Sequence, residues 1–168
     1  LVLKLNRVFD DTGKIKDNAS SKLSRIRTTI VALKSRIRRA LQHIINDKEQ
    51  AVFFRDAIIT QRNDRYVVPI KEEYRYRFDG IVHDRSSTGQ TLYMEPMISV
   101  QLNNDLTEAY AEEKSEIRNI LLSLTKEVYK NSKEIYLNCE LATQMEFVFA
   151  RGQLALDMQG IRAVCSKN

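Results

Sequence analysis

Cationic and aromatic side chains alternate along the middle of this chain. Three tyrosines (Tyr66, Tyr74 and Tyr76) are interleaved with five cations, namely Arg62, Arg65, Lys71, Arg75 and Arg77. Such cations can hold phosphate oxygens, and tyrosine rings can stack on bases. The competing interpretation is a solvated sheet face whose cations are neutralised by neighbouring acids. Because residues 55–95 contain seven Lys/Arg and seven Asp/Glu, charge counting slightly favours this second interpretation.

A second group of polar side chains follows closely at residues 84–90. The pattern predicts a β-hairpin over residues 80–96 with Asp84–Gln90 as its loop. In that loop an exposed Arg85 and the hydroxyls of Ser86, Ser87 and Thr88 could donate hydrogen bonds to phosphate oxygens. Alternatively, these residues only close a turn. A His83, Asp84 and Ser86 triad is rejected, because neighbouring residues on a strand point to opposite faces.

No catalytic or cofactor site is expected within this chain. The sequence contains neither GxxxxGK[ST] nor GxGxxG, so no nucleotide site is expected. Two histidines without cysteine-pair spacing argue against zinc. Cys139 and Cys165 are interpreted as free thiols of a cytoplasmic protein. No apolar run reaches the about 18 residues of a membrane-spanning helix, so no membrane partner is expected.

Long helices must position these side chains, since the chain has only five Gly and two Pro. Residues 1–18 predict a strand (LVLKL) and a polar turn, the remnant of a larger core. Residues 19–54 predict a first long helix of about 45 Å. Its apolar positions alternate by three and four, as in a coiled-coil seam: Leu23, Ile26, Ile30, Leu33, Ile37, Ala40 and Ile44.

The remaining segments complete a mainly α fold with a small antiparallel β insertion. Residues 55–95 contain short β-branched and aromatic runs separated by polar turns, which predicts a four-stranded sheet. Residues 96–158 predict a returning helix, with its apolar stripe interrupted at Glu113, and a third helix after a break at Asn131. Residues 159–168 are interpreted as a tail. The predicted architecture is therefore a pair of long antiparallel helices capped by the sheet.

The net charge of +5 is distributed unevenly along the chain. Residues 19–48 contain eight Lys/Arg and one acid, whereas residues 97–158 contain six Lys/Arg and ten Asp/Glu. This distribution predicts either two helices that attract each other across a seam or a basic face for nucleic acid. Charge alone favours the seam.

Four strings resemble a known family, the second MutS lineage (MutS-II). They are TQRNDRYVVPIK (60–71), GIVHDRSSTGQTLYMEP (80–96), LNNDLTEAYAEEKSEIRNIL (102–121) and LATQMEFVFARGQLAL (141–156). The second string is the most specific, because the mismatch-repair branch of MutS lacks it. The resemblance covers residues 10–158. The departures are small: Asp64 stands where Gly is frequent, and Arg85 and Thr88 replace other small or polar residues.

The resemblance implies that the chain is the lever and clamp of a larger protein. That parent would be a dimeric, DNA-binding ATPase that uses ATP and Mg and has a C-terminal Smr endonuclease domain. Its implied partners are branched or duplex DNA in recombination suppression, or the rRNA of stalled ribosomes. The chain itself is then expected to transmit ATP-driven motion without catalysing a reaction. The alternative is a structural coiled-coil module that dimerises or binds protein partners without touching nucleic acid.

Overall fold

The computed structural model describes residues 1–160 and has the predicted fold class, four helices with one four-stranded antiparallel sheet. The predicted tail at 159–168, with Cys165, lies almost wholly outside the described residues. The chain divides into two compact units, one spanning Val2–Leu121 and the other running from Leu122 onward.

The first residues are helical, so the strand predicted at LVLKL is wrong. Helix α1 spans Val2–Val8, and the polar turn that follows closes through a single bridge between Phe9 and Ile15. Leu and Lys are good helix formers. The four strands of the sheet all come from later in the chain, so this segment has no strand to pair with there. The Asp10 carboxylate accepts bonds from the Thr12 hydroxyl and the Lys14 amide, and these hold the pKa of Asp10 below its usual value.

Helix α2 spans Ser21–Ile45 and buries the predicted seam. Its N-cap is Ser20, whose hydroxyl accepts a hydrogen bond from the Leu23 amide at 3.0 Å. It ends well before the predicted residue 54, because the backbone turns at Asp47 and enters the short 3-10 helix η1 (Ala51–Phe53). The seam departs from the prediction at one position, since Leu41 rather than Ala40 is fully buried. A straight helix drifts by about 20° per heptad relative to a 3.5-residue repeat, which brings Leu41 inward.

The sheet has the strand order β1-β2-β4-β3, with every pair antiparallel. Asn63 and Asp64 connect β1 to β2 with φ angles of 50° and 61°, the conformation of a two-residue type I′ turn. Asp64 therefore occupies a position where glycine is favoured. The strands are β1 (Thr60–Arg62), β2 (Arg65–Lys71), β3 (Gly80–Arg85) and β4 (Thr91–Pro96), with the 3-10 helix η2 (Glu72–Tyr74) after β2.

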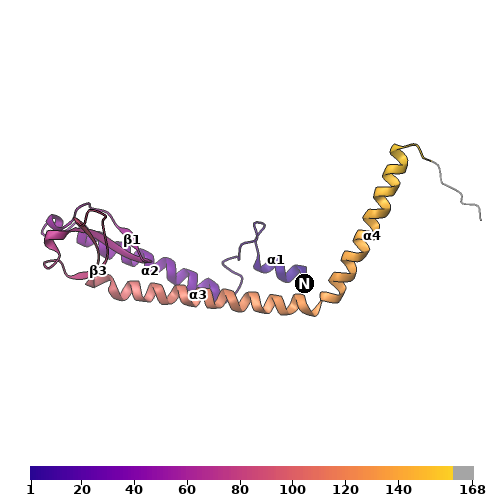
Figure 1. Cartoon of the computed structure of the whole chain (residues 1–168). Helices are drawn as coiled ribbons and strands as arrows, with labels where there is room; N and C mark the ends of the chain where they lie inside the picture. The colour runs from indigo at the N-terminus through magenta and orange to yellow at the C-terminus, as the bar shows by residue number, and fades with distance from the viewer. Residues whose placement is uncertain (161–168) are drawn as a thin grey trace, which may run out of the picture. The chain divides into compact units, whose positions relative to one another are not determined.

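One face of the sheet packs on the C-terminal half of α2. The core there joins Ile37 and Leu41 of α2 with Val68 and Ile70 of β2 and with Met94 of β4. Figure 1 shows the sheet where α2 ends and the next long helix, α3 (Met97–Lys130), begins. The insertion therefore rests on the helices rather than folding alone, as a small sheet requires.

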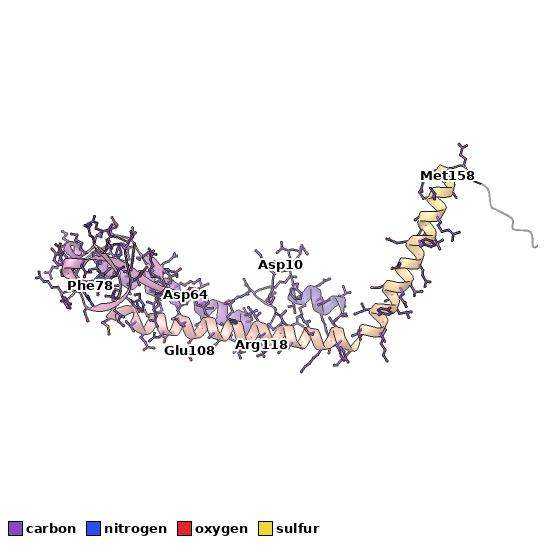
Figure 2. All side chains as sticks on the ribbon, viewed as in Figure 1. Asp10, Asp64, Phe78, Glu108, Arg118 and Met158 are labelled. Atoms are coloured by element: carbon purple, nitrogen blue, oxygen red, sulfur yellow. The ribbon has the colours of Figure 1, made fainter. Side chains whose placement is uncertain are left out.

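Two further helices follow the sheet: α3 (Met97–Lys130) and α4 (Ser132–Asp157). The break between them falls at Asn131, as predicted. Leu106 and Ala109 of α3 are buried in the same core as α2. The side chains of α4 are exposed along its whole length, and Figure 2 shows them extending away from the helix. No helix among the described residues is long and apolar enough to cross a membrane.

Candidate nucleic-acid interface

A fully buried carboxylate, Glu95 at the end of β4, anchors the sheet. Arg65 of β2 donates from Nη1 to both carboxylate oxygens, at 2.9 and 3.1 Å. His83 of β3 places Nε2 2.6 Å from Glu95 Oε2, and Asn103 of α3 donates to Oε1 at 2.7 Å. Gly80 permits the approach of β3, because a Cβ there would lie 2.6 Å from the Glu95 carbonyl oxygen. One carboxylate thus joins three strands to α3.

Asn103 and Asn104 extend this network into the first turns of α3. The Asn103 side chain accepts the Tyr66 amide and donates to the Tyr66 carbonyl, both at 3.2 Å, so it pairs with β2 as a strand would. Asn104 Oδ1 accepts a bond from Arg65 Nη2 at 2.5 Å. Because the buried polar groups of this network are satisfied, it fixes the sheet on α3 and limits its movement relative to that helix.

Only some of the basic residues of α2 pair with acidic residues of α3. Arg27 of α2 donates to Glu113 of α3 at 2.7 Å, and Lys22 lies 3.6 Å from Glu116. Glu113, which interrupts the apolar stripe of α3, is therefore the partner of a half-buried arginine. The bonds to Glu113 and then to Asp17 raise the pKa of Arg27. The seam interpretation thus holds for the first turns of α2.

Comparison with known proteins shows which family has sequences similar to this chain. No family model matches it. Endonuclease MutS2 of Geobacillus sp. (strain WCH70) is 41% identical over 160 residues, which are 95% of this chain and 20% of that relative. Endonuclease MutS2 of Bacillus cytotoxicus is 41% identical over 161 residues, or 96% of this chain and 20% of the relative. The chain belongs to the MutS2 family. The match confirms the resemblance, and the chain spans about a fifth of its curated relatives' length.

Three of the predicted phosphate-binding residues of this MutS2 chain are already engaged within it. Arg65 belongs to the Glu95 network. Arg62 pairs with Asp84 at 3.1 Å and lies over the Tyr93 ring at 4.0 Å from its centre. Lys71 donates to the Val52 carbonyl at 2.9 Å. Arg62 and Arg65 thus pair with acids, though not with those nearest in the sequence, whereas Lys71 is held by a backbone carbonyl.

The β3–β4 hairpin of the MutS2 chain forms as predicted, with a loop shortened to residues 86–90. Ser86 closes the turn, because its hydroxyl accepts the Thr91 amide at 3.1 Å and lies 3.3 Å from the Thr88 hydroxyl. Ser87 is exposed. Arg85 is half exposed, and its nearest carboxylate, on Glu72, is 3.9 Å away. The hairpin therefore combines a turn-closing serine with an arginine that is only weakly paired.

The segment after η2 presents the most accessible predicted residues. Tyr76 has 91% of its surface exposed, and the Arg75 guanidinium lies over its ring at 5.3 Å from the centre. Arg77 is exposed, and no hydrogen bond or ion pair to its side chain is found within residues 1–160. Arg85 at the end of β3 and this Arg-Tyr-Arg segment between η2 and β3 thus supply the predicted cations that remain available to a partner.

Sequence reasoning missed two features of this MutS2 chain. The first is the anchor of Glu95, His83 and Asn103, since period-two alternation places Glu95 beside Tyr93 on a face that could equally have been solvated. The second is the division of the α2 cations: Lys22 and Arg27 pair with α3, whereas the basic face that the charge distribution leaves open as an alternative lies only over the later turns of the helix. Among the described residues no cluster of three or more His, Cys, Asp or Glu could hold a metal ion.

Proposed function

We propose that this chain is a non-catalytic lever and clamp that contacts the phosphate backbone of nucleic acid through its sheet. The observation that carries the proposal is the contrast within the sheet between fixed and available cations. Arg65 is held by the buried Glu95, whereas Arg85 at the end of β3 is only weakly paired, and Arg75 and Arg77 are accessible in the turn that leads into β3. Cations on a rigid support position a polyanion without reading its sequence.

The paired helices supply the lever in this proposal. The α2–α3 seam combines buried apolar residues with the Arg27–Glu113 pair, so a displacement along the helices would move packed layers in discrete steps. The sheet would follow, because the Glu95 network and the shared core join it to both helices. The driving step, ATP hydrolysis with Mg, is proposed for the longer parent protein.

Relatives of this chain are named endonucleases, which supports nucleic acid as the partner of the parent. We propose a dimeric parent that acts on branched or duplex DNA or on the rRNA of stalled ribosomes. A second candidate function is supported by α4, whose exposed Phe149, Leu154 and Leu156 could bind a protein partner.

The test measures binding of the chain to branched DNA and to ribosomes over a range of salt concentrations. Replacing Arg77 with Ala should weaken binding to nucleic acid of any sequence and lower the salt slope by about one counterion. Thermal stability should stay near its original value, because the side chain is exposed. Arg55→Ala, which removes an exposed arginine just before the sheet, serves as the control. If the salt slope of binding is the same for Arg77→Ala, Arg85→Ala and the unaltered chain, the proposed contact between the sheet region and nucleic acid is wrong.

A further inference from the structure

Helix α2 carries seven Lys/Arg and no acidic residue between Ser21 and Ile45. Its first turns use this charge internally, through the Lys22 and Arg27 pairs with α3. Farther along, Lys34, Arg36, Arg38 and Arg39 have no carboxylate partner among the described residues. Four cations within six positions repel one another, so this arrangement is costly unless an anion lies nearby.

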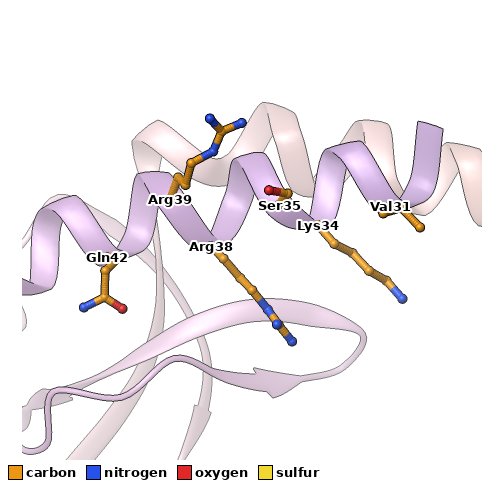
Figure 3. Close-up of a pocket in the computed structure, with 6 residues that line it drawn as sticks. All are labelled: Val31, Lys34, Ser35, Arg38, Arg39 and Gln42. Carbon is orange, nitrogen blue, oxygen red and sulfur yellow. The ribbon is translucent and has the colours of Figure 1, made fainter. Parts of the chain in front are cut away.

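Part of this cationic segment borders a hollow that is open to solvent. The hollow has a volume of about 520 Å³ and is lined by Val31, Lys34, Ser35, Arg38, Arg39 and Gln42. Lys34, Arg38 and Gln42 extend from the same side of α2 toward the strands beside it, whereas Arg39 extends the other way (Figure 3). A second hollow, of about 420 Å³, shares Arg38 and Gln42 and reaches Thr60 and Gln61 of β1.

The aromatic residues of this face hold two of the cations in place. Lys34 Nζ lies 5.3 Å from the centre of the Tyr110 ring, and the Arg38 guanidinium lies 6.0 Å from the centre of the Tyr66 ring. The hydrogen bond to Tyr110 raises the pKa of Lys34, so the amine stays protonated. Lys34 and Arg38 are one helical turn apart and therefore present two charges about 6 Å apart along the axis.

We propose that the side of α2 bordering this hollow, comprising Lys34, Ser35, Arg38 and Gln42 with Arg39 at its opposite rim, is a binding surface for the phosphate backbone of duplex DNA. It is a second surface, distinct from the sheet cations of the proposed function, and it extends the binding surface onto the lever. The proposal rests on the proposed function only in taking nucleic acid as the partner.

The chemistry of the face selects a duplex over a single strand. Single strands are bound on exposed aromatic faces on which bases stack, whereas on this side of α2 Tyr66 is buried and the ring of Tyr110, 38% exposed, already contacts the Lys34 amine. Duplex RNA is recognised largely through its 2′-hydroxyls and its A-form shape. The proposed surface offers mainly cations, which suit neutralisation of the phosphates of B-DNA.

The test compares two pairs of substitutions with identical spacing and charge. Lys34→Gln with Arg38→Gln removes two cations from the face, and Lys114→Gln with Arg118→Gln removes an exposed Lys and Arg at the same spacing on α3. Binding of the whole chain to a 20-base-pair DNA duplex is measured against salt. The α2 pair should lower the salt slope by about 0.9 for each phosphate that is no longer neutralised, and the α3 pair should leave the slope nearly unchanged.

A further variant keeps the comparison valid if the α2 pair unfolds. Arg39→Gln removes an exposed cation for which no hydrogen bond or ion pair is found within residues 1–160, and it should lower the slope by about 0.9 alone. An equal reduction of the slope in the α2 and α3 pairs would overturn the proposal, because it would show only a general effect of net charge. Equal binding of single-stranded DNA, duplex RNA or polyglutamate, with the same reduction in the α2 variants, would overturn the assignment to duplex DNA.

The outcomes also separate this proposal from the sheet surface. If the slope falls for Arg77→Ala but not for the α2 variants, the proposed function stands and the α2 surface is wrong. If it falls for the α2 variants alone, DNA binds on the lever and the proposed sheet surface is wrong. If neither changes, both proposals fail.

Discussion

At the scale of single residues, Glu95 is the one charged side chain that is buried among residues 1–160. Its carboxylate is fully buried, yet Arg65, His83 and Asn103 all hydrogen-bond to it. A buried ion is tolerated only when such partners replace the water that it loses. The same partners come from two other strands and from α3, so local satisfaction of one charge also sets the position of the sheet.

Replacing Glu95 with Ala should therefore destabilise the chain by about 3–5 kcal/mol, because Arg65 would remain partly buried without its carboxylate. Glu95→Gln keeps the shape and should cost less, since the amide oxygen still accepts bonds. Chemical denaturation monitored by circular dichroism measures both values. Glu112, which is exposed on α3, is the control, and its replacement with Ala should change stability by less than about 0.5 kcal/mol. Similar destabilisation by Glu95→Ala and Glu112→Ala would contradict the anchor.

At the scale of elements, α2 has one buried stripe with two different partners. Its first turns pack along α3, where Arg27 and Lys22 meet Glu113 and Glu116. Its later turns pack under the sheet, where Leu41 replaces the predicted Ala40 in the core. A regular heptad alone would not distinguish these partners, because any apolar surface can cover an apolar stripe.

The seam predicts a large difference between two aliphatic residues of α2. Ile37 is fully buried, whereas Val31 has 68% of its surface exposed. Ile37→Ala should cost about 2–5 kcal/mol, because it removes buried apolar surface and leaves a residual cavity. Val31→Ala should change stability by less than about 0.5 kcal/mol. Thermal unfolding of both variants is the measurement, and equal melting temperatures would show that the seam is misplaced.

At the scale of the whole molecule, the two units bury their apolar residues to different extents. The Val2–Leu121 unit has a continuous core shared by the sheet, α2 and α3. In α4 the described residues leave large apolar side chains exposed, among them Phe147, Phe149 and Leu156. Apolar patches of this kind commonly mark surfaces that contact another protein or another protein segment.

Two phenylalanines should report this difference directly. Phe78 is 7% exposed in the core, and Phe149 is 69% exposed on α4. Phe78→Ala should cost about 3–5 kcal/mol, whereas Phe149→Ala should leave the free energy of unfolding almost unchanged and reduce binding of a hydrophobic dye. Calorimetry and dye fluorescence measure the two effects. A strongly destabilised Phe149→Ala variant would show that α4 is buried within the chain.

The sequence by itself determined the family, the fold class, the seam of α2, the hairpin over residues 80–96 and the break at Asn131. These features depend on local periodicity, turn chemistry and specific strings, all of which are present in neighbouring residues. The helical N-terminus was missed because a short apolar run fits a strand as well as a helix. Only the tertiary structure decided which cations are available. Arg65, Arg27 and Arg38 look alike in the sequence, yet Arg65 is held by Glu95, 30 positions away, and Arg27 by Glu113, 86 positions away, whereas no acid pairs with Arg38 among the described residues.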